Sequence, residues 1–254
     1  MNVALTVTAL KMGVLLLEKA FDGIQKRTPI RQPVWAAAIS GGERKILVDT
    51  GLHDSQWISQ NCVPCEIGPE ETMEASLARI GWRLEDVEIV VNTHLHYDHV
   101  GNNPRFPGAL FYTGYQEWET AFHPPASQAF LYENTRQLYD QRGVRPDHWI
   151  LVSQELELIP GVRLLPTPGH TEGHLSVLVE TAEGVVCIAG DAVMFMENLE
   201  AGYVNLLHTD RDACLRSYHL IQARADRVFP GHSERIFPFQ TRGFPLIPNH
   251  KKGG

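Results

Sequence analysis

The segment 94–99 limits the possible fold and chemistry of this chain more than any other. It places three imidazoles and a carboxylate within six residues, directly after a predicted buried strand. That strand, 87–93, is short, β-branched and apolar on both faces, which is typical of a strand covered from both sides. Beyond it, His94 and His96 alternate and point to one side, while Asp98 and His99 follow round the turn. One loop can therefore address two neighbouring metal ions. Imidazole and carboxylate without thiolate suit Zn, Fe, Mn or Co.

Three later segments each offer one further ligand. His170, Asp191 and His232 all lie beside a glycine, at or just beyond the end of a predicted strand. One loop cannot complete two coordination shells, so ligands from other strand ends are expected. Asp191 is the natural bridge between the ions. The complete set of candidate ligands is His94, His96, Asp98, His99, His170, Asp191 and His232.

The hydrophobic periodicity predicts an α/β (α+β) chain. Residues 5–10 and 13–18 read as two short strands around a Lys11-Met12 turn, and 34–40 with 45–50 repeat the pattern around Gly41-Gly42. Two successive runs of strands followed by helices predict two sheets packed face to face with helices outside. Further strands are expected at 109–113, 162–165, 175–180, 185–189 and 227–229, and helices at 70–81, 116–122, 128–142 and 211–225. We expect a single domain over 1–254, with a helical insertion at about 116–148.

Composition narrows the class of partner. The formal net charge is −8 and the basic residues are scattered, which disfavours nucleic acid and other polyanions. The apolar start, 3–17, is interrupted by Lys11 and Gly13 and has the flanks of neither a signal peptide nor a membrane span. The four cysteines show no disulfide-framework spacing. These features predict a soluble, cytoplasmic protein without membrane contact; a homodimer is one arrangement that the sequence leaves open.

The order H-x-H-x-D-H, then H, D and H, resembles the metallo-β-lactamase superfamily over roughly residues 34 to 235. The resemblance implies an αββα sandwich of two mixed β-sheets flanked by helices, with the metal site at one edge of the sheets. It also implies that His94, His96 and His170 hold one ion and that Asp98, His99 and His232 hold the other, with Asp191 shared.

Two other residues recur in the pattern of this superfamily. Asp49, in Asp49-Thr50-Gly51, matches an aspartate of the superfamily that follows a strand and forms hydrogen bonds with the metal-binding loop, here 94–99. An aspartate that only stabilises its own turn fits the sequence equally well. We interpret His174 as a structural residue, because the seven candidate ligands already complete the coordination shells of both ions.

A carboxylate-bridged pair of ions lowers the pKa of a shared water from about 15.7 toward about 7. The implied enzyme is a metal-dependent hydrolase in which a metal-bound hydroxide attacks an ester carbonyl, with Asp191 as the bridge and Asp98 able to return the proton. Two divalent ions, first of all Zn, are the expected cofactors, with Fe, Mn or Co as alternatives.

Within the superfamily, Thr93 to Asn103 looks most like the N-acyl homoserine lactonase group, which implies a small-molecule lactone or related ester as substrate. One residue departs from that pattern. The lactonases place a tyrosine three residues after the bridging aspartate, where it hydrogen-bonds the substrate carbonyl, and here Met194 stands there. Tyr203 and His208 are the nearest polar substitutes, while Met194 itself could line an apolar pocket.

Three other readings stay open. A glyoxalase-II-like thioester hydrolase fits the same histidine motif, but the segment after His232 is short for a second domain. A mononuclear iron dioxygenase would use only His94, His170 and Asp191. A metal-containing ligand sensor would keep the site purely for binding.

Overall fold

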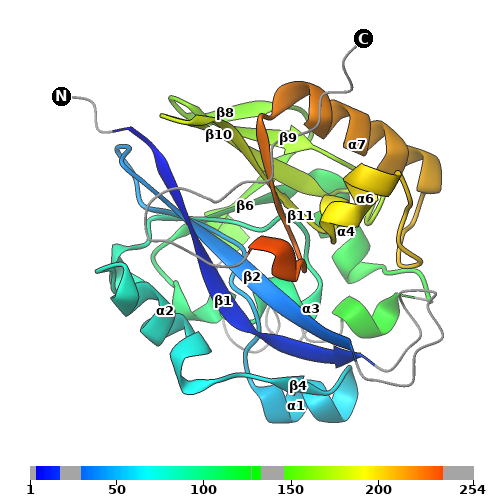
Figure 1. Ribbon diagram of the computed structural model, residues 1–254. Helices are drawn as coiled ribbons and strands as arrows, with labels where there is room; N and C mark the ends of the chain where they lie inside the picture. The colour runs from blue at the N-terminus through cyan, green and yellow to red at the C-terminus, as the bar shows by residue number, and fades with distance from the viewer. Residues whose placement is uncertain (1–3, 18–29, 127, 133–145, 237–254) are drawn as a thin grey trace.

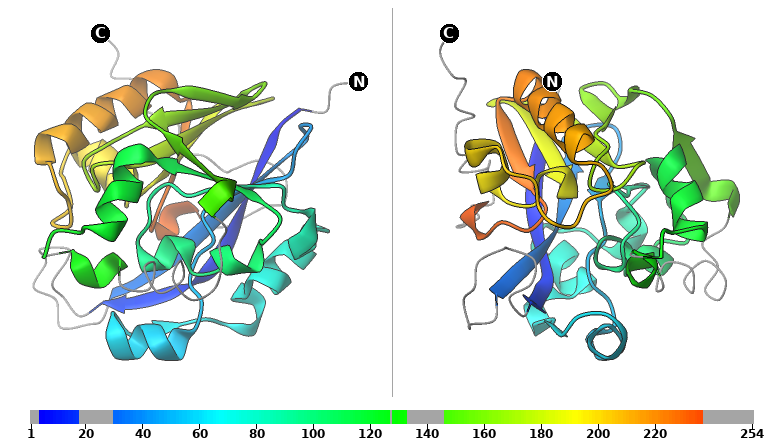
Figure 2. Two further views of the ribbon diagram at one scale, coloured as in Figure 1. Left: turned by 180° about the vertical axis from the view of Figure 1, so that it is seen from behind. Right: turned by 90° about the vertical axis from the view of Figure 1, so that its right-hand side faces the viewer.

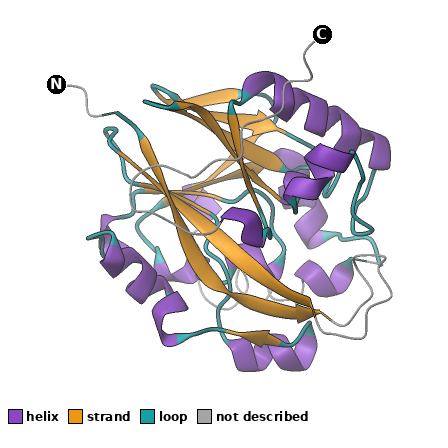
Figure 3. Ribbon diagram, in the orientation of Figure 1, coloured by secondary structure: helices purple, strands orange, loops and turns teal. Residues whose placement is uncertain are grey.

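The computed structural model describes residues 4–17, 30–126, 128–132 and 146–236. Its strands form two mixed sheets, and helices cover the outer faces of both (Figure 3). This is the αββα sandwich of the α/β class that the sequence predicts.

The larger sheet has seven strands in the order β4-β1-β2-β3-β5-β6-β7. Its first four members pair antiparallel, and β3, β5, β6 and β7 run parallel. The strands are β1 (Thr6–Leu17), β2 (Ile30–Ser40), β3 (Ile46–Val48), β4 (Cys65–Glu66), β5 (Ile89–Val91), β6 (Leu110–Gly114) and β7 (Trp149–Val152).

The smaller sheet has five strands in the order β12-β11-β10-β9-β8. Only β11 and β12 pair parallel, so their carboxyl ends meet at one edge of the sheet. The strands are β8 (Leu156–Ile159), β9 (Val162–Pro166), β10 (Leu175–Thr181), β11 (Gly184–Gly190) and β12 (Arg227–Pro230).

Three apolar clusters hold the four layers together. The middle cluster joins the inner faces of the two sheets, for example Trp35 and Ile39 of β2 with Val177 of β10 and Phe229 of β12. A second cluster lies between the larger sheet and its helices, and a third between the smaller sheet and its helices. Alternation along the central strands sends successive side chains to different clusters, which is why strands such as β3 and β5 are buried on both faces.

The helices lie on the outside, as the two views of Figure 2 show. Helix α7, the longest of the described helices, covers the smaller sheet (Figure 1). The described α-helices are α1 (Ser55–Asn61), α2 (Met73–Arg79), α3 (Tyr97–Val100), α4 (Tyr115–Phe122), α6 (Met196–Ala201) and α7 (Arg211–Arg224).

The prediction of a hairpin at the start of the chain is wrong. Instead of two short strands around a Lys11-Met12 turn, β1 is one strand of 12 residues that pairs with β2 over its whole length. Its register with β2 shifts between Lys11 and Val14, and Gly13 adopts a φ of 117°, so the irregularity is a bulge. Side-chain alternation breaks at a bulge much as it does at a turn, which explains the misreading.

Most other predicted elements are present. The Gly41-Gly42 hairpin joins β2 to β3, the buried strand before His94 is β5, and the hairpin after Thr181 joins β10 to β11. The predicted helix 128–142 falls mostly outside the described residues, so the helical insertion and the single-domain organisation remain predictions. Elements α1, β4, α3, β7, β8 and α6 were not predicted; Asp98 and His99 were expected on a turn and lie in α3. Among the described helices, none has the length and apolarity needed to cross a membrane.

Candidate metal centre

The candidate ligands lie in segments that follow four different strands. His94 and His96 follow β5, and Asp98 and His99 belong to the short helix α3 that comes next. His170 follows β9, Asp191 follows β11 and His232 follows β12. These loops meet at one edge of the two sheets, and all seven side chains are buried there. The structure therefore brings together every residue that the sequence proposed as a ligand.

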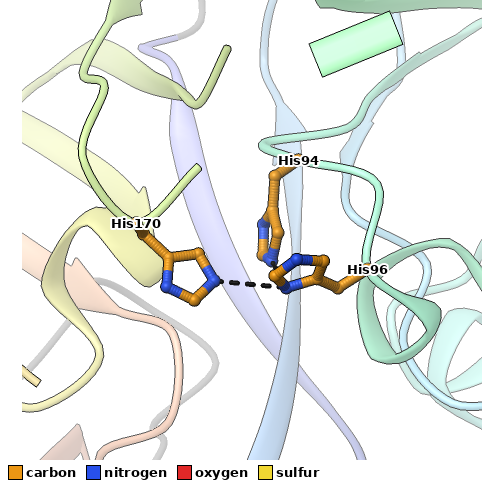
Figure 4. A group of neighbouring side chains, drawn as sticks. All are labelled: His94, His96 and His170. Atoms are coloured by element: carbon orange, nitrogen blue, oxygen red, sulfur yellow. Dashed lines mark hydrogen bonds between the residues drawn. The ribbon is translucent and has the colours of Figure 1, made fainter. Parts of the chain in front are cut away.

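Three imidazole nitrogens converge on one point of this edge. Nε2 of His94 lies 3.1 Å from Nδ1 of His96, and Nε2 of His170 lies 3.2 Å from the same atom. Figure 4 shows His170 facing the other two rings from the opposite loop. Nitrogens around a tetrahedral Zn²⁺ with bonds of about 2.05 Å are about 3.3 Å apart, so the three atoms have the spacing of a ligand set.

A second group contains Asp98, His99 and His232. Oδ2 of Asp98 lies 3.7 Å from Nε2 of His99 and 3.5 Å from Nε2 of His232. This group could hold a further cation, because its ligand atoms lie within 4.8 Å of one another.

Asp191 lies between the two groups. Its Oδ2 is 3.4 Å from Nε2 of His170, while its Oδ1 is 3.3 Å from Nε2 of His99 and 3.2 Å from Nε2 of His232. Each carboxylate oxygen thus faces a different group. Gly231 permits this approach, because a Cβ at that position would overlap Oδ1 of Asp191.

Hydrogen bonds to main-chain and carboxylate oxygens orient three of the rings. Nδ1 of His170 donates to the Leu207 carbonyl at 2.9 Å, and Nδ1 of His232 donates to the Pro33 carbonyl at 2.8 Å. Nδ1 of His99 donates to Asp49 at 2.8 Å. Because a carbonyl or carboxylate oxygen can only accept, each ring directs Nε2 toward the centre, which is how histidine ligands are held in metal sites.

Asp49 forms hydrogen bonds with two residues of the segment 93–99, which carries four of the candidate ligands. Its Oδ1 accepts from the Thr93 amide at 2.7 Å, and its Oδ2 accepts from the Thr93 hydroxyl at 2.8 Å as well as from His99. Asp49 adopts a left-handed φ of 58°, a conformation that aspartate tolerates better than most residues. Burial raises the pKa of its carboxyl, and the neighbouring His99 opposes that rise.

His174 has a structural role. Its Nε2 accepts from the Ala192 amide at 3.1 Å, and its Nδ1 lies 3.0 Å from the Thr167 hydroxyl. Both ring nitrogens are therefore occupied, and burial holds the pKa of His174 well below its usual value. The bond to Ala192 fixes the turn that carries Asp191.

The unsatisfied polar atoms of this centre fit a cation. Nε2 of His99 and Oδ1 of Asp191 are buried and lie 3.3 Å apart, yet neither forms a hydrogen bond of good geometry with a described residue. Buried polar atoms are almost always paired, and an exception calls for an ion or a water. The donor set of imidazole and carboxylate is the one that first-row divalent ions prefer.

The pKa shifts of the histidines differ between the two ligand groups. Burial lowers the pKa of His94 and His96 well below the usual value, and the neighbouring imidazoles add to that effect. Burial also opposes protonation of His99 and His232, but the carboxylates of Asp191 and Asp98 outweigh it and raise the pKa of both. Without metal, His99 and His232 therefore hold a proton more readily than His94 and His96 do.

We expect binding of Zn²⁺ to the metal-free protein at pH 7 to release protons, because a metal binds only neutral imidazole. The sign follows from the raised pKa of His99 and His232. Proton competition weakens as the pH rises through these raised values, so metal affinity should increase and proton release should decline. Calorimetric titration in two buffers of different ionisation enthalpy measures the release. Binding at pH 7 without any proton release would contradict the expectation.

Glu117 is a buried residue that the sequence did not single out. It lies in the first turn of α4 and is fully buried. Its Oε1 accepts from the Leu95 amide and from the Tyr132 hydroxyl, both at 2.9 Å. The Tyr132 ring in turn packs edge to face against His96, with centroids 4.7 Å apart. Glu117 thereby connects α4 to the metal loop. In sequence it resembles the neighbouring Glu119, which is exposed, so only tertiary structure distinguishes them.

A pocket that is open to solvent borders the centre. Its walls are mainly apolar, and they include Met194. Tyr203 and His208, the proposed polar substitutes for the lactonase tyrosine, are absent from the described lining. Tyr203 is exposed, and His208 bonds through Nδ1 to the Asn205 carbonyl. The lining residues are Leu15, Leu17, Ile30, Gln32, Val63, His96, Tyr97, Asp98, Phe130, Leu131, Asp191, Met194, Phe195, Asn205, Leu207 and His232.

The fold and the clustered ligands define an αββα protein with a candidate metal centre at the edge of its sheets. Residues 30–232 match the family model described as the metallo-beta-lactamase superfamily. The chain belongs to that superfamily, as its histidine motif predicted.

Two kinds of relative agree with this assignment. An N-acyl homoserine lactonase of Bacillus cereus is 32% identical over 233 residues, which cover 86% of each chain. A solved N-acyl homoserine lactone hydrolase with N-hexanoyl-L-homoserine at its metal centre superposes with a TM-score of 0.74, at 24% identity, over 92% of this chain and 95% of that one. A dizinc quorum-quenching lactonase superposes with a TM-score of 0.72, at 16% identity, over 98% and 96%. The two structures support the fold.

Proposed function

We propose that this chain is a dinuclear metal-dependent hydrolase that opens a lactone or a related carboxylic ester, most like an N-acyl homoserine lactonase. The observation that carries the proposal is the position of Asp191, whose two oxygens face two separate histidine groups. A bridging carboxylate of this kind serves two ions better than one. His94, His96 and His170 would hold the first ion, and Asp98, His99 and His232 the second. The homology to lactonases supports the choice of substrate.

Two divalent ions, most simply Zn²⁺, would lower the pKa of a shared water toward about 7 and polarise an ester carbonyl. The residues of the chain supply the rest of the mechanism. Asp98 lines the pocket, so its carboxylate can take up a proton and return it to the leaving oxygen. Asp49 fixes the orientation of His99, and the apolar walls limit the access of water to the reacting bond.

Activity on a substrate panel tests the proposal. We expect the metal-loaded protein to release protons fastest from lactones, more slowly from thioesters, and least from β-lactams. Loss of this activity after chelation, and its return with Zn²⁺, Mn²⁺, Co²⁺ or Fe²⁺, would identify the metal that supports turnover.

Other outcomes would replace the proposal. Preference for thioesters would favour a glyoxalase-II-like enzyme. One iron per chain with oxygen uptake would favour a dioxygenase using His94, His170 and Asp191. Two metals with no turnover on any ester would favour a ligand sensor.

A further inference from the structure

Gln32 is a polar side chain on an otherwise apolar wall of the pocket. It is 3% exposed and lines the pocket beside Leu15, Leu17 and Ile30. Its side chain forms no hydrogen bond with any residue in the described part of the chain. The amide of Gln32 is therefore free to form hydrogen bonds with a polar group of a ligand that enters the pocket.

The strand register places Gln32 between the metal centre and the apolar end of the pocket. Pro33, the next residue in β2, accepts the hydrogen bond from His232. Gln32 pairs with Leu15, and Ile30 pairs with Leu17, so these four side chains share one face of the β1–β2 ribbon. Ile30 lies two residues, about 7 Å, further along the strand. Figure 1 shows the two strands side by side.

The other polar groups of the lining are less suited to this position. Asn205 is engaged in reciprocal hydrogen bonds with Asn198, at 3.2 and 3.3 Å. Tyr97 also lines the pocket without a hydrogen bond to a described residue, but it directly precedes Asp98 and carries a single hydroxyl. A glutamine amide can donate and accept together, which matches both groups of a secondary amide.

Resting on the proposed function, we infer that Gln32 is a specificity-determining residue that binds a secondary amide of the substrate. That amide lies between the ester carbonyl at the metal centre and an alkyl chain on the apolar wall. A site that pairs with a polar group discriminates against an analogue that lacks it, because the bound analogue excludes water from the amide of Gln32 and leaves that amide unpaired. The contribution of Gln32 therefore shows in the ratio of turnover of an N-acyl lactone to that of a plain alkyl lactone.

The test compares an N-acyl amino lactone with an alkyl lactone of matched length, on the metal-loaded protein. We expect the wild type to favour the N-acyl lactone, and Gln32→Leu to reduce the ratio of the two kcat/KM values about tenfold, mainly through KM. The intrinsic reactivities of the two lactones are the same for every variant, so they cancel when the ratios of wild type and variant are compared. Gln32→Glu, which keeps the shape but loses the donors, should also reduce the ratio. The exposed Gln60→Leu should leave it unchanged.

Three results would overturn the inference. An unchanged ratio in Gln32→Leu excludes the role, as does a loss that appears in Tyr97→Phe but not in Gln32→Leu. A fall in Tm of Gln32→Leu, with both substrates affected equally, would mean that the residue is structural. A recognition role predicts an unchanged or higher Tm, because leucine suits the apolar wall.

Failure of the proposed function would look different. If the wild type hydrolysed neither lactone, that proposal would fall, and binding would then test Gln32. An N-acyl amino acid with a free carboxylate, titrated into the metal-loaded protein, should bind about tenfold more tightly to the wild type than to Gln32→Leu. Equal Kd values would overturn the inference.

Discussion

Replacing Asp191 with asparagine is expected to lower kcat/KM on the preferred lactone by roughly 10³-fold, or about 4 kcal/mol of barrier. An amide has one oxygen and an NH₂ group, so it can face only one of the two histidine groups as a ligand. The structure places one carboxylate oxygen toward His170 and the other toward His99 and His232. The variant should therefore also bind fewer than two metal ions per chain.

Metal content, kcat/KM and thermal unfolding of the same preparation check this prediction. Asp212→Asn is the matched control, because Asp212 is exposed on α7 and lies outside the candidate centre. It should retain two metals and full activity. Undiminished activity of Asp191→Asn, with two metals still bound, would refute the bridging role.

Replacing Glu117 with alanine is expected to lower the free energy of unfolding by about 3 kcal/mol and to weaken metal binding. The substitution leaves the Leu95 amide and the Tyr132 hydroxyl without their acceptor in a buried environment. It also releases the Tyr132 ring, which packs against His96. Glu117→Gln should retain most of the stability, because its amide oxygen can accept both hydrogen bonds.

The pH dependence of stability gives a second readout. Burial raises the pKa of Glu117, and the hydrogen bonds from Leu95 and Tyr132 only partly offset that rise. A carboxyl whose folded pKa is raised contributes stability at low pH that is lost as the pH rises through the folded value. Glu117→Gln lacks this loss, so its stability relative to the wild type should improve between acidic and neutral pH.

Denaturant unfolding and metal titration of both variants test the role of Glu117. Glu119→Ala is the control, since Glu119 is an exposed residue of the same helix. Equal effects of the two alanine substitutions would mean that helix α4, rather than the buried network, determines the result.

Sequence periodicity predicted the local elements well where one signal dominated. The strand before His94 is apolar on both faces, and only a position between two other layers explains that pattern. The start of the chain was misread because the Gly13 bulge interrupts side-chain alternation as a turn would. The two-residue strand β4 is too short for any periodic signal.

The candidate ligands could be identified without coordinates, because imidazoles and carboxylates that follow predicted strands carry a recognisable chemical pattern. Tertiary structure alone decided which atoms face one another. It placed the two oxygens of Asp191 toward different histidine groups, buried Glu117 rather than Glu119, and turned Gln32 toward the pocket. These outcomes depend on the packing of segments far apart in the chain, such as Pro33 with His232, and local sequence does not encode such long-range contacts.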